Sequence, residues 1–140
     1  MSPFSHLLHD LRTSRNIRQA QLAALVGYDQ TYISALEVGL KGPPTRELIS
    51  RLATALSLAP DQADELYEAA EASQRKLVID TDLPREVYVL LSRLRTSLRG
   101  LTPTQVRVIN DVLNMTSPDG GSWDTPAPRI VRRGKKEAQM

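Results

Sequence analysis

The stretch Ile17–Gly39 reads IRQAQLAALVGYDQTYISALEVG, and its pattern of apolar and small residues decides the fold. One face of its first half is apolar and is formed by Leu22, Ala23 and Val26. Gly27 follows that face, where a helix needs a residue in the left-handed conformation to end. Asp29 is a favourable N-cap for a second helix that runs to about Val38. The stretch therefore predicts two short helices joined by a tight turn.

The second of these helices has two different faces. Ile33 and Leu36 turn to one side, where they seal the helix onto a core. The opposite side carries short or uncharged side chains, namely Gln30, Thr31, Ser34 and Ala35. Glutamine can bond adenine through two hydrogen bonds, Ser and Thr can bond several bases, and an Ala methyl can touch a thymine methyl. This face is therefore suited to reading base edges in the major groove.

The stretch resembles the helix-turn-helix of the phage repressor and Cro class, also called the XRE family, and the likeness extends over about Phe4 to Leu58. The resemblance implies a five-helix bundle that binds double-stranded DNA, with Gln30, Thr31, Ser34 and Ala35 as the base-reading set. It further implies that Gln19 bonds a phosphate and braces Gln30. Tyr32 and Lys41 would contact the DNA backbone.

Two further features follow from the same resemblance. Arg12 and Glu37 occupy positions that in some members form a partly buried ion pair between the first helix and the recognition helix, and we expect a structural clamp there. Val38 and Leu40 depart from the pattern, because polar or basic residues are usual at those positions. We therefore expect fewer phosphate contacts and a flatter dependence of affinity on salt.

The helices around this stretch follow from apolar periodicity and capping residues. We expect one helix from about Ser2 or Pro3 to Ser14, a second capped by Thr45, and a third with Pro60 in its first turn. The third carries a cluster of acids, Asp61, Asp64, Glu65, Glu68 and Glu71. That cluster is either a solvated surface or an interface for another protein.

Beyond residue 82 the sequence predicts a helical hairpin. One helix opens at Pro84 and stops at Gly100, and Thr102 followed by Pro103 starts the next. The first helix carries a leucine-rich stripe of candidate dimerisation residues, Val87, Leu90, Leu91, Leu94 and Leu98. Two helices of this length cannot bury both stripes alone, so the hairpin should pack on the first domain or on a second copy of itself.

The predicted fold is all-α and has three parts. Residues 1–72 form the helix-turn-helix domain, residues 83–115 the hairpin and residues 116–140 a flexible basic tail. For that tail a solubilising role and a nonspecific DNA-contacting role are both open. The chain of 140 residues has a net charge of +2, which favours nucleic acid only weakly, and no cysteine.

These features exclude several function classes. We find no nucleophile and base pair, no phosphate-cradling glycine loop and no metal cluster, so we expect no enzyme, no catalytic residues and no cofactor. His6 and His9 lack a third spaced ligand, so we expect no metal. With neither a signal peptide nor a long apolar run, we expect a cytoplasmic protein with no membrane partner.

The function predicted from the sequence is a sequence-specific DNA-binding regulator of transcription. It would act as a repressor, with a homodimer occupying a (pseudo)palindromic operator. The alternative is an antitoxin or another protein-binding module that autoregulates through its helix-turn-helix. In that case a protein partner would bind the acidic helix or the C-terminal hairpin.

Overall fold

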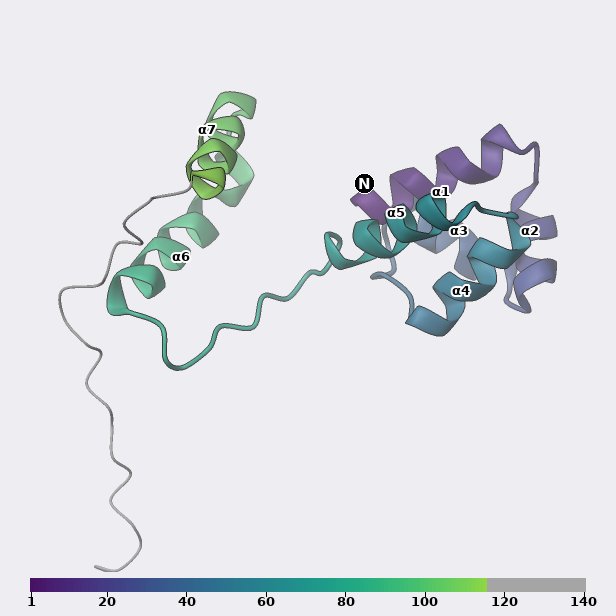
Figure 1. The fold of residues 1–140 in the computed structure, drawn as a ribbon, viewed down its shortest axis with the longest axis horizontal. Helices are drawn as coiled ribbons and strands as arrows, with labels where there is room; N and C mark the ends of the chain where they lie inside the picture. Colours follow the sequence, from purple (N-terminus) through teal and green to yellow (C-terminus); the bar gives the residue numbers. More distant parts are fainter. Residues whose placement is uncertain (116–140) are drawn as a thin grey trace, which may run out of the picture. The chain divides into compact units, whose positions relative to one another are not determined.

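The computed structural model describes residues 1–115, and this part of the chain contains helices joined by loops and no strand (Figure 1). In chain order they are α1 (Pro3–Ser14), α2 (Gln19–Val26), α3 (Gln30–Val38), α4 (Arg46–Ala55), α5 (Pro60–Glu71), α6 (Arg85–Ser97), the short 3₁₀ helix η1 (Leu98–Gly100) and α7 (Pro103–Asn114). The all-α prediction is confirmed. The chain divides into a first unit, Met1–Leu77, and a second unit that begins at Val78. The tail predicted for residues 116–140 lies outside the described residues.

The helix ends of the first unit are set by local capping. Ser2 accepts a hydrogen bond from the Ser5 amide at 3.2 Å, and the Ser2 amide donates to Ser5 Oγ at 2.8 Å. Such a reciprocal pair satisfies two amides that an α-helix leaves free at its start. Thr45 caps α4 in the expected way by accepting from the Leu48 amide, and Pro60 stands in the first turn of α5.

The turn between α2 and α3 depends on one glycine. Gly27 has φ of 75° and ψ of 34°, a left-handed conformation that costs a residue with a Cβ about 1–2 kcal/mol. In this conformation the Gly27 and Tyr28 amides both donate to the Ala23 carbonyl, which closes α2. Asp29 then occupies the N-cap position of α3 as expected, but its side chain makes no capping hydrogen bond.

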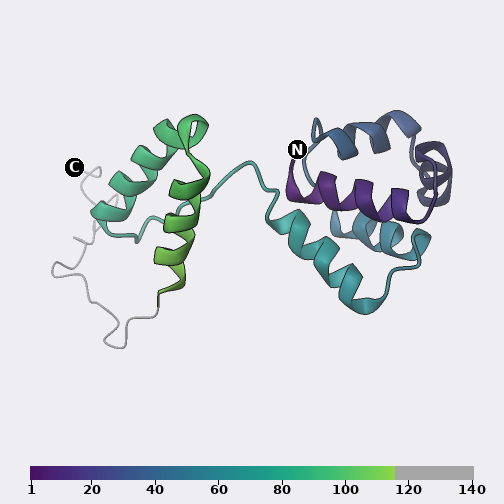
Figure 2. The same ribbon diagram turned by 90° about the horizontal axis from the view of Figure 1, so that it is seen from above.

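The five helices of the first unit enclose one core (Figure 2). Helix α1 packs against α3 and α5, α2 packs against α3 and α4, and α4 packs against α5. The fully buried apolar side chains come from all five helices and include Phe4, Leu8, Leu22, Ile33, Leu36, Leu48, Leu52 and Leu66. Leu22 and Ile33 both belong to the stretch that the sequence singled out, so the short helices α2 and α3 are held by their buried sides.

The second unit is a helical hairpin with little buried surface of its own (Figure 2). No side chain of α6 or α7 is fully buried. Of the candidate dimerisation stripe, Val87, Leu91 and Leu94 are half-buried, whereas Leu90 and Leu98 are 61% and 58% exposed. Helix α7 exposes an apolar stripe of its own, formed by Val106, Ile109, Val112 and Leu113.

No helix among residues 1–115 is both long enough and apolar enough to span a membrane.

Candidate nucleic-acid interface

Helix α3 divides into a buried side and an accessible side. Ile33 and Leu36 are 0% and 1% exposed, and they fix the helix on the core. Of the four residues predicted to read bases, Gln30 and Thr31 are exposed, and Ser34 and Ala35 are half-buried. Gln30 and Ser34, and likewise Thr31 and Ala35, are four residues apart, so the four side chains are neighbours on the helix surface. A rigid helix with an accessible polar side has the geometry that major-groove reading requires.

The support for α3 comes from α2. Ala23 is 3% exposed and Val26 is 2% exposed, so the apolar side of α2 packs against the core and against α3. Ala23 is small enough to allow the two helices to cross closely next to the Gly27 turn. The position of α3 is therefore set by packing rather than by its own helix propensity, which is low for nine residues.

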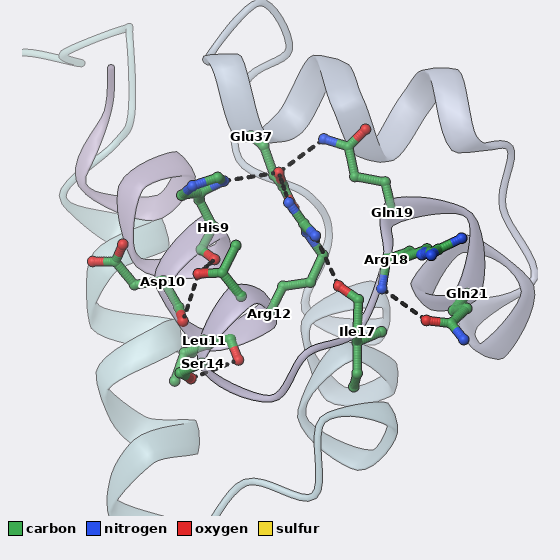
Figure 3. A network of polar contacts seen from close by, with 11 residues as sticks. His9, Asp10, Leu11, Arg12, Ser14, Ile17, Arg18, Gln19, Gln21 and Glu37 are labelled. Carbon is green, nitrogen blue, oxygen red and sulfur yellow. Dashed lines mark hydrogen bonds and ion pairs between the residues drawn. The ribbon is translucent and has the colours of Figure 1, made fainter.

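Glu37 lies at the centre of a polar cluster that joins α1, α2 and α3 (Figure 3). Its side chain is 3% exposed. Arg12 donates from Nε to Glu37 Oε1 and from Nη2 to Glu37 Oε2, the second bond being 3.0 Å long. Gln19 Nε2 donates to Oε2 at 2.9 Å, and His9 Nδ1 lies 3.2 Å from the same oxygen. The carboxylate is thus fully engaged by donors.

This cluster determines the charge state of Glu37. Burial raises the pKa of the carboxyl group, but hydrogen bonds from Arg12, Gln19 and His9, together with the positive charge of Arg12, lower it more. The net effect is a pKa below the ordinary value for glutamate. Glu37 is therefore ionised at neutral pH and forms a true ion pair with Arg12.

Arg12 also ties the cluster to the backbone. Its Nη1 donates to the Ile17 carbonyl at 2.7 Å, in the loop between α1 and α2 (Figure 3). One guanidinium therefore connects α1, the loop before α2, and α3. The structure brings Arg12 and Glu37 together as the resemblance implied. Every buried side-chain N or O atom among residues 1–115 has a hydrogen-bond partner, so the cluster leaves no uncompensated polar group there.

Two details of this cluster differ from what the sequence suggested. The resemblance implied that Gln19 braces Gln30, but the Gln19 amide donates to Glu37, because a buried carboxylate is the stronger acceptor. His9 was predicted to bind no metal and was given no other partner, yet it faces Glu37. His9 and Arg12 are three residues apart on α1 and so share a face, which is the signal that could have placed both beside one carboxylate.

An aromatic pair lies at the start of α3. The rings of Tyr28 and Tyr32 stack with centroids 5.2 Å apart and planes inclined by 25°. Tyr28 is 42% exposed, whereas Tyr32 is half-buried against the core. Burial and the neighbouring Tyr28 raise the pKa of Tyr32, so its hydroxyl stays protonated and available as a donor. Tyr28 was not singled out from the sequence, because it lies in the turn before α3 and outside the apolar periodicity.

The segment after α3 is partly tethered. The Gly39 carbonyl accepts a hydrogen bond from Arg75, which follows α5. Lys41 is exposed, as a backbone-contacting residue must be, and Leu40 is 76% exposed. Within residues 1–115 no three His, Cys, Asp or Glu side chains gather where they could hold a metal ion. His6 instead pairs with Asp10 at 3.1 Å on the surface of α1.

Comparison with known proteins gives a matching family model and a similar solved structure. Residues 3–66 match a family model described as a helix-turn-helix domain, which confirms the resemblance stated for residues 17–39. No curated protein matches the chain in sequence. The chain is similar to a solved structure titled SinR protein/SinI protein complex, with 20% identity over 79% of this chain and 93% of that one. Its TM-score is 0.41.

Proposed function

We propose that this chain, whose residues 3–66 form an XRE-type helix-turn-helix domain of a DNA-binding regulator, binds a specific double-stranded site and represses transcription from it. The observation that carries the proposal is that α3 has both buried residues and exposed polar residues. Ile33, Leu36 and Glu37 hold the helix on the core, whereas Gln30 and Thr31 in its first turn are exposed and accessible to a groove.

The proposed DNA contacts fall into two groups, base contacts and backbone contacts. Gln30, Thr31, Ser34 and Ala35 contact base edges, which gives specificity, whereas Gln19, Tyr32 and Lys41 contact the sugar-phosphate backbone, which gives register and affinity. Gln19 Nε2 carries two hydrogens, so it can keep its bond to Glu37 and still donate to a phosphate oxygen. Occupancy of a promoter would then block polymerase without any catalytic step.

Binding to duplex DNA tests this proposal directly. We expect the full chain to select a preferred sequence from randomised duplexes, and Gln30→Ala or Thr31→Ala to weaken binding to that sequence by about 1–3 kcal/mol per lost base contact. Gln74→Ala is a matched control, because Gln74 is an exposed glutamine just beyond α5. Equal losses on the selected sequence and on random DNA would contradict the assignment of α3 as the reading helix.

The same proposal includes a homodimer that places two copies of α3 in successive major grooves, about 34 Å apart, on a (pseudo)palindromic site. The support for self-association comes from the hairpin. Leu90 and Leu98 continue the apolar stripe of α6 but stay more than half exposed. A second hairpin would cover them and form a four-helix arrangement.

The Leu90→Glu variant distinguishes loss of a dimer interface from loss of the fold. Because Leu90 is 61% exposed in one chain, the substitution should leave the fold intact and convert a dimer to a monomer in light scattering. Val89→Glu is the control, since Val89 is 52% exposed but lies off the stripe. A Leu90→Glu variant of unchanged mass would argue against the hairpin as the dimer interface. A second small protein that copurifies and binds the stripe would favour the antitoxin-type alternative.

A further inference from the structure

The accessible face of α3 is rich in methyl groups. Thr31, Ala35 and Val38 are spaced i, i+4 and i+7, so they lie along one face of the helix. That face is opposite the buried set of Ile33, Leu36 and Glu37. Val38 is 53% exposed and Thr31 is exposed, whereas Ala35 between them is half-buried. The helix thus offers a line of methyl groups to whatever lies in front of it.

The same helix offers no charge to a partner. Its sequence, QTYISALEV, contains one ionisable residue with a formal charge, Glu37. The Glu37 side chain is 3% exposed and its oxygens are bound by Arg12, Gln19 and His9. Helix α3 therefore presents neither a guanidinium nor an ammonium to guanine O6 and N7, the commonest specific base contact, and no carboxylate to cytosine N4.

We propose that α3 reads A·T base pairs, with Gln30 bonding adenine and with Thr31, Ala35 and Val38 contacting thymine 5-methyl groups. This inference rests on the proposed function and names the class of DNA sequence that the site takes. It gives Val38 a role that its departure from the family pattern left open. Val38 acts as a specificity-determining residue through an apolar contact in the major groove, at a position where a polar side chain would contact phosphate.

Selection from randomised duplexes with the full chain is the first test. We expect the half-site positions that face α3 to be occupied by A·T pairs, with thymines in a run that matches one face of the helix. Guanine and cytosine at those positions would overturn the inference while leaving the proposed function intact. Enrichment of no sequence at all would overturn the proposed function and this inference with it.

Deoxyuridine substitution is the second and sharper test, because it removes the thymine methyl and keeps every hydrogen-bonding group. Burial of one such group corresponds to about a fourfold change in affinity at 25 °C. We expect each contacted thymine to show a loss of about that size when replaced by deoxyuridine, measured by fluorescence anisotropy on the selected duplex.

Val38→Ala identifies which thymine Val38 contacts. In this variant the penalty for deoxyuridine should vanish at one position and persist at the others, because the protein methyls that sensed that thymine are gone. Val89→Ala on α6, an equally exposed valine, should leave every penalty unchanged. Equal binding of thymine and deoxyuridine duplexes by the unmodified chain would overturn the methyl contacts, and unchanged penalties in Val38→Ala would overturn the role of Val38.

Discussion

The two units of this chain are built from similar amphipathic helices but bury their apolar side chains to different extents. Both consist of short amphipathic helices with proline or threonine at their starts and leucine-rich stripes. In the first unit five helices surround one core and leave Leu22, Leu36 and Leu52 almost completely buried. In the second unit two helices leave Leu90 more than half exposed. Two helices cannot enclose an interior, so identical apolar periodicity yields a core in one region and a surface in the other.

The polar side chains of the two units also differ, because those of the first unit bond across helices and those of the second unit bond locally. Glu37 is buried and satisfied by donors from α1 and α2, so its contribution depends on the folded unit. In the second unit, the described side-chain hydrogen bonds are local. Tyr88 donates to the Asp80 carbonyl at 2.7 Å, and Thr102 and Gln105 exchange capping bonds. Substitutions in the two units should therefore have very different costs, and the following predictions test that difference.

The largest effect is expected from Arg12→Ala. Removal of Arg12 leaves the Glu37 carboxylate buried with its main partner gone, which in such pairs costs about 3–5 kcal/mol of unfolding free energy. Arg95→Ala on α6 is the control and should change the free energy by less than about 0.5 kcal/mol, because Arg95 is exposed. Urea denaturation followed by circular dichroism measures both. Similar small values for the two variants would show that the cluster is not a clamp.

Leu52→Ala should come next in magnitude. Leu52 is 0% exposed in the core, so its truncation should cost about 2–5 kcal/mol through lost burial and the cavity that remains. Leu90→Ala in the second unit should cost much less within a single chain, since Leu90 is already exposed. Denaturation at low protein concentration keeps self-association out of the comparison. If Leu90→Ala becomes costly only at high concentration, a second copy covers that residue.

Gly27→Ala should have a smaller effect than either substitution. The left-handed φ of 75° makes alanine unfavourable by about 1–2 kcal/mol, although a Cβ there would meet no atom within 4 Å. Gly100→Ala is the matched control, because Gly100 also has open space around it and its φ is not positive. It should be neutral or slightly stabilising. Equal costs for both alanines, measured by thermal unfolding, would contradict backbone strain as the cause.

Acid should destabilise the first unit through Glu37. The pKa of Glu37 is lower in the folded chain than in the unfolded chain, so its stabilisation is fully present above the unfolded value. That stabilisation is lost as pH falls below the ordinary pKa of glutamate and through the lowered folded pKa. A Glu37→Gln variant should show a flatter decline of unfolding free energy over this window. A decline as steep as that of the unmodified chain would mean that other carboxylates govern acid unfolding.

Sequence reasoning was most successful where one local signal defines a structure. The predicted helix ends at Ser14, Gly27 and Val38 and the predicted starts at Thr45 and Pro60 agree closely with the structure, because prolines, serine and threonine caps and Gly27 act within a single turn. It was less successful at Gln19 and His9. Their partner, Glu37, is 18 and 28 residues away, and nothing local indicates which long-range acceptor a polar side chain will choose. Tyr28 was missed for a different reason, because it lies in the turn before α3 and outside the apolar periodicity, although its partner Tyr32 is close in sequence.

The sequence by itself determined that the chain is helical, that a helix-turn-helix lies at residues 17–39, and which side of α3 is free of large apolar residues. Only the tertiary structure decided that Glu37 is withdrawn from that side and bound by three neighbours, which leaves α3 without an exposed charge. The physical reason is one of range. Periodicity and caps act over a few residues, whereas the charge state and accessibility of a side chain depend on which distant helices come to surround it.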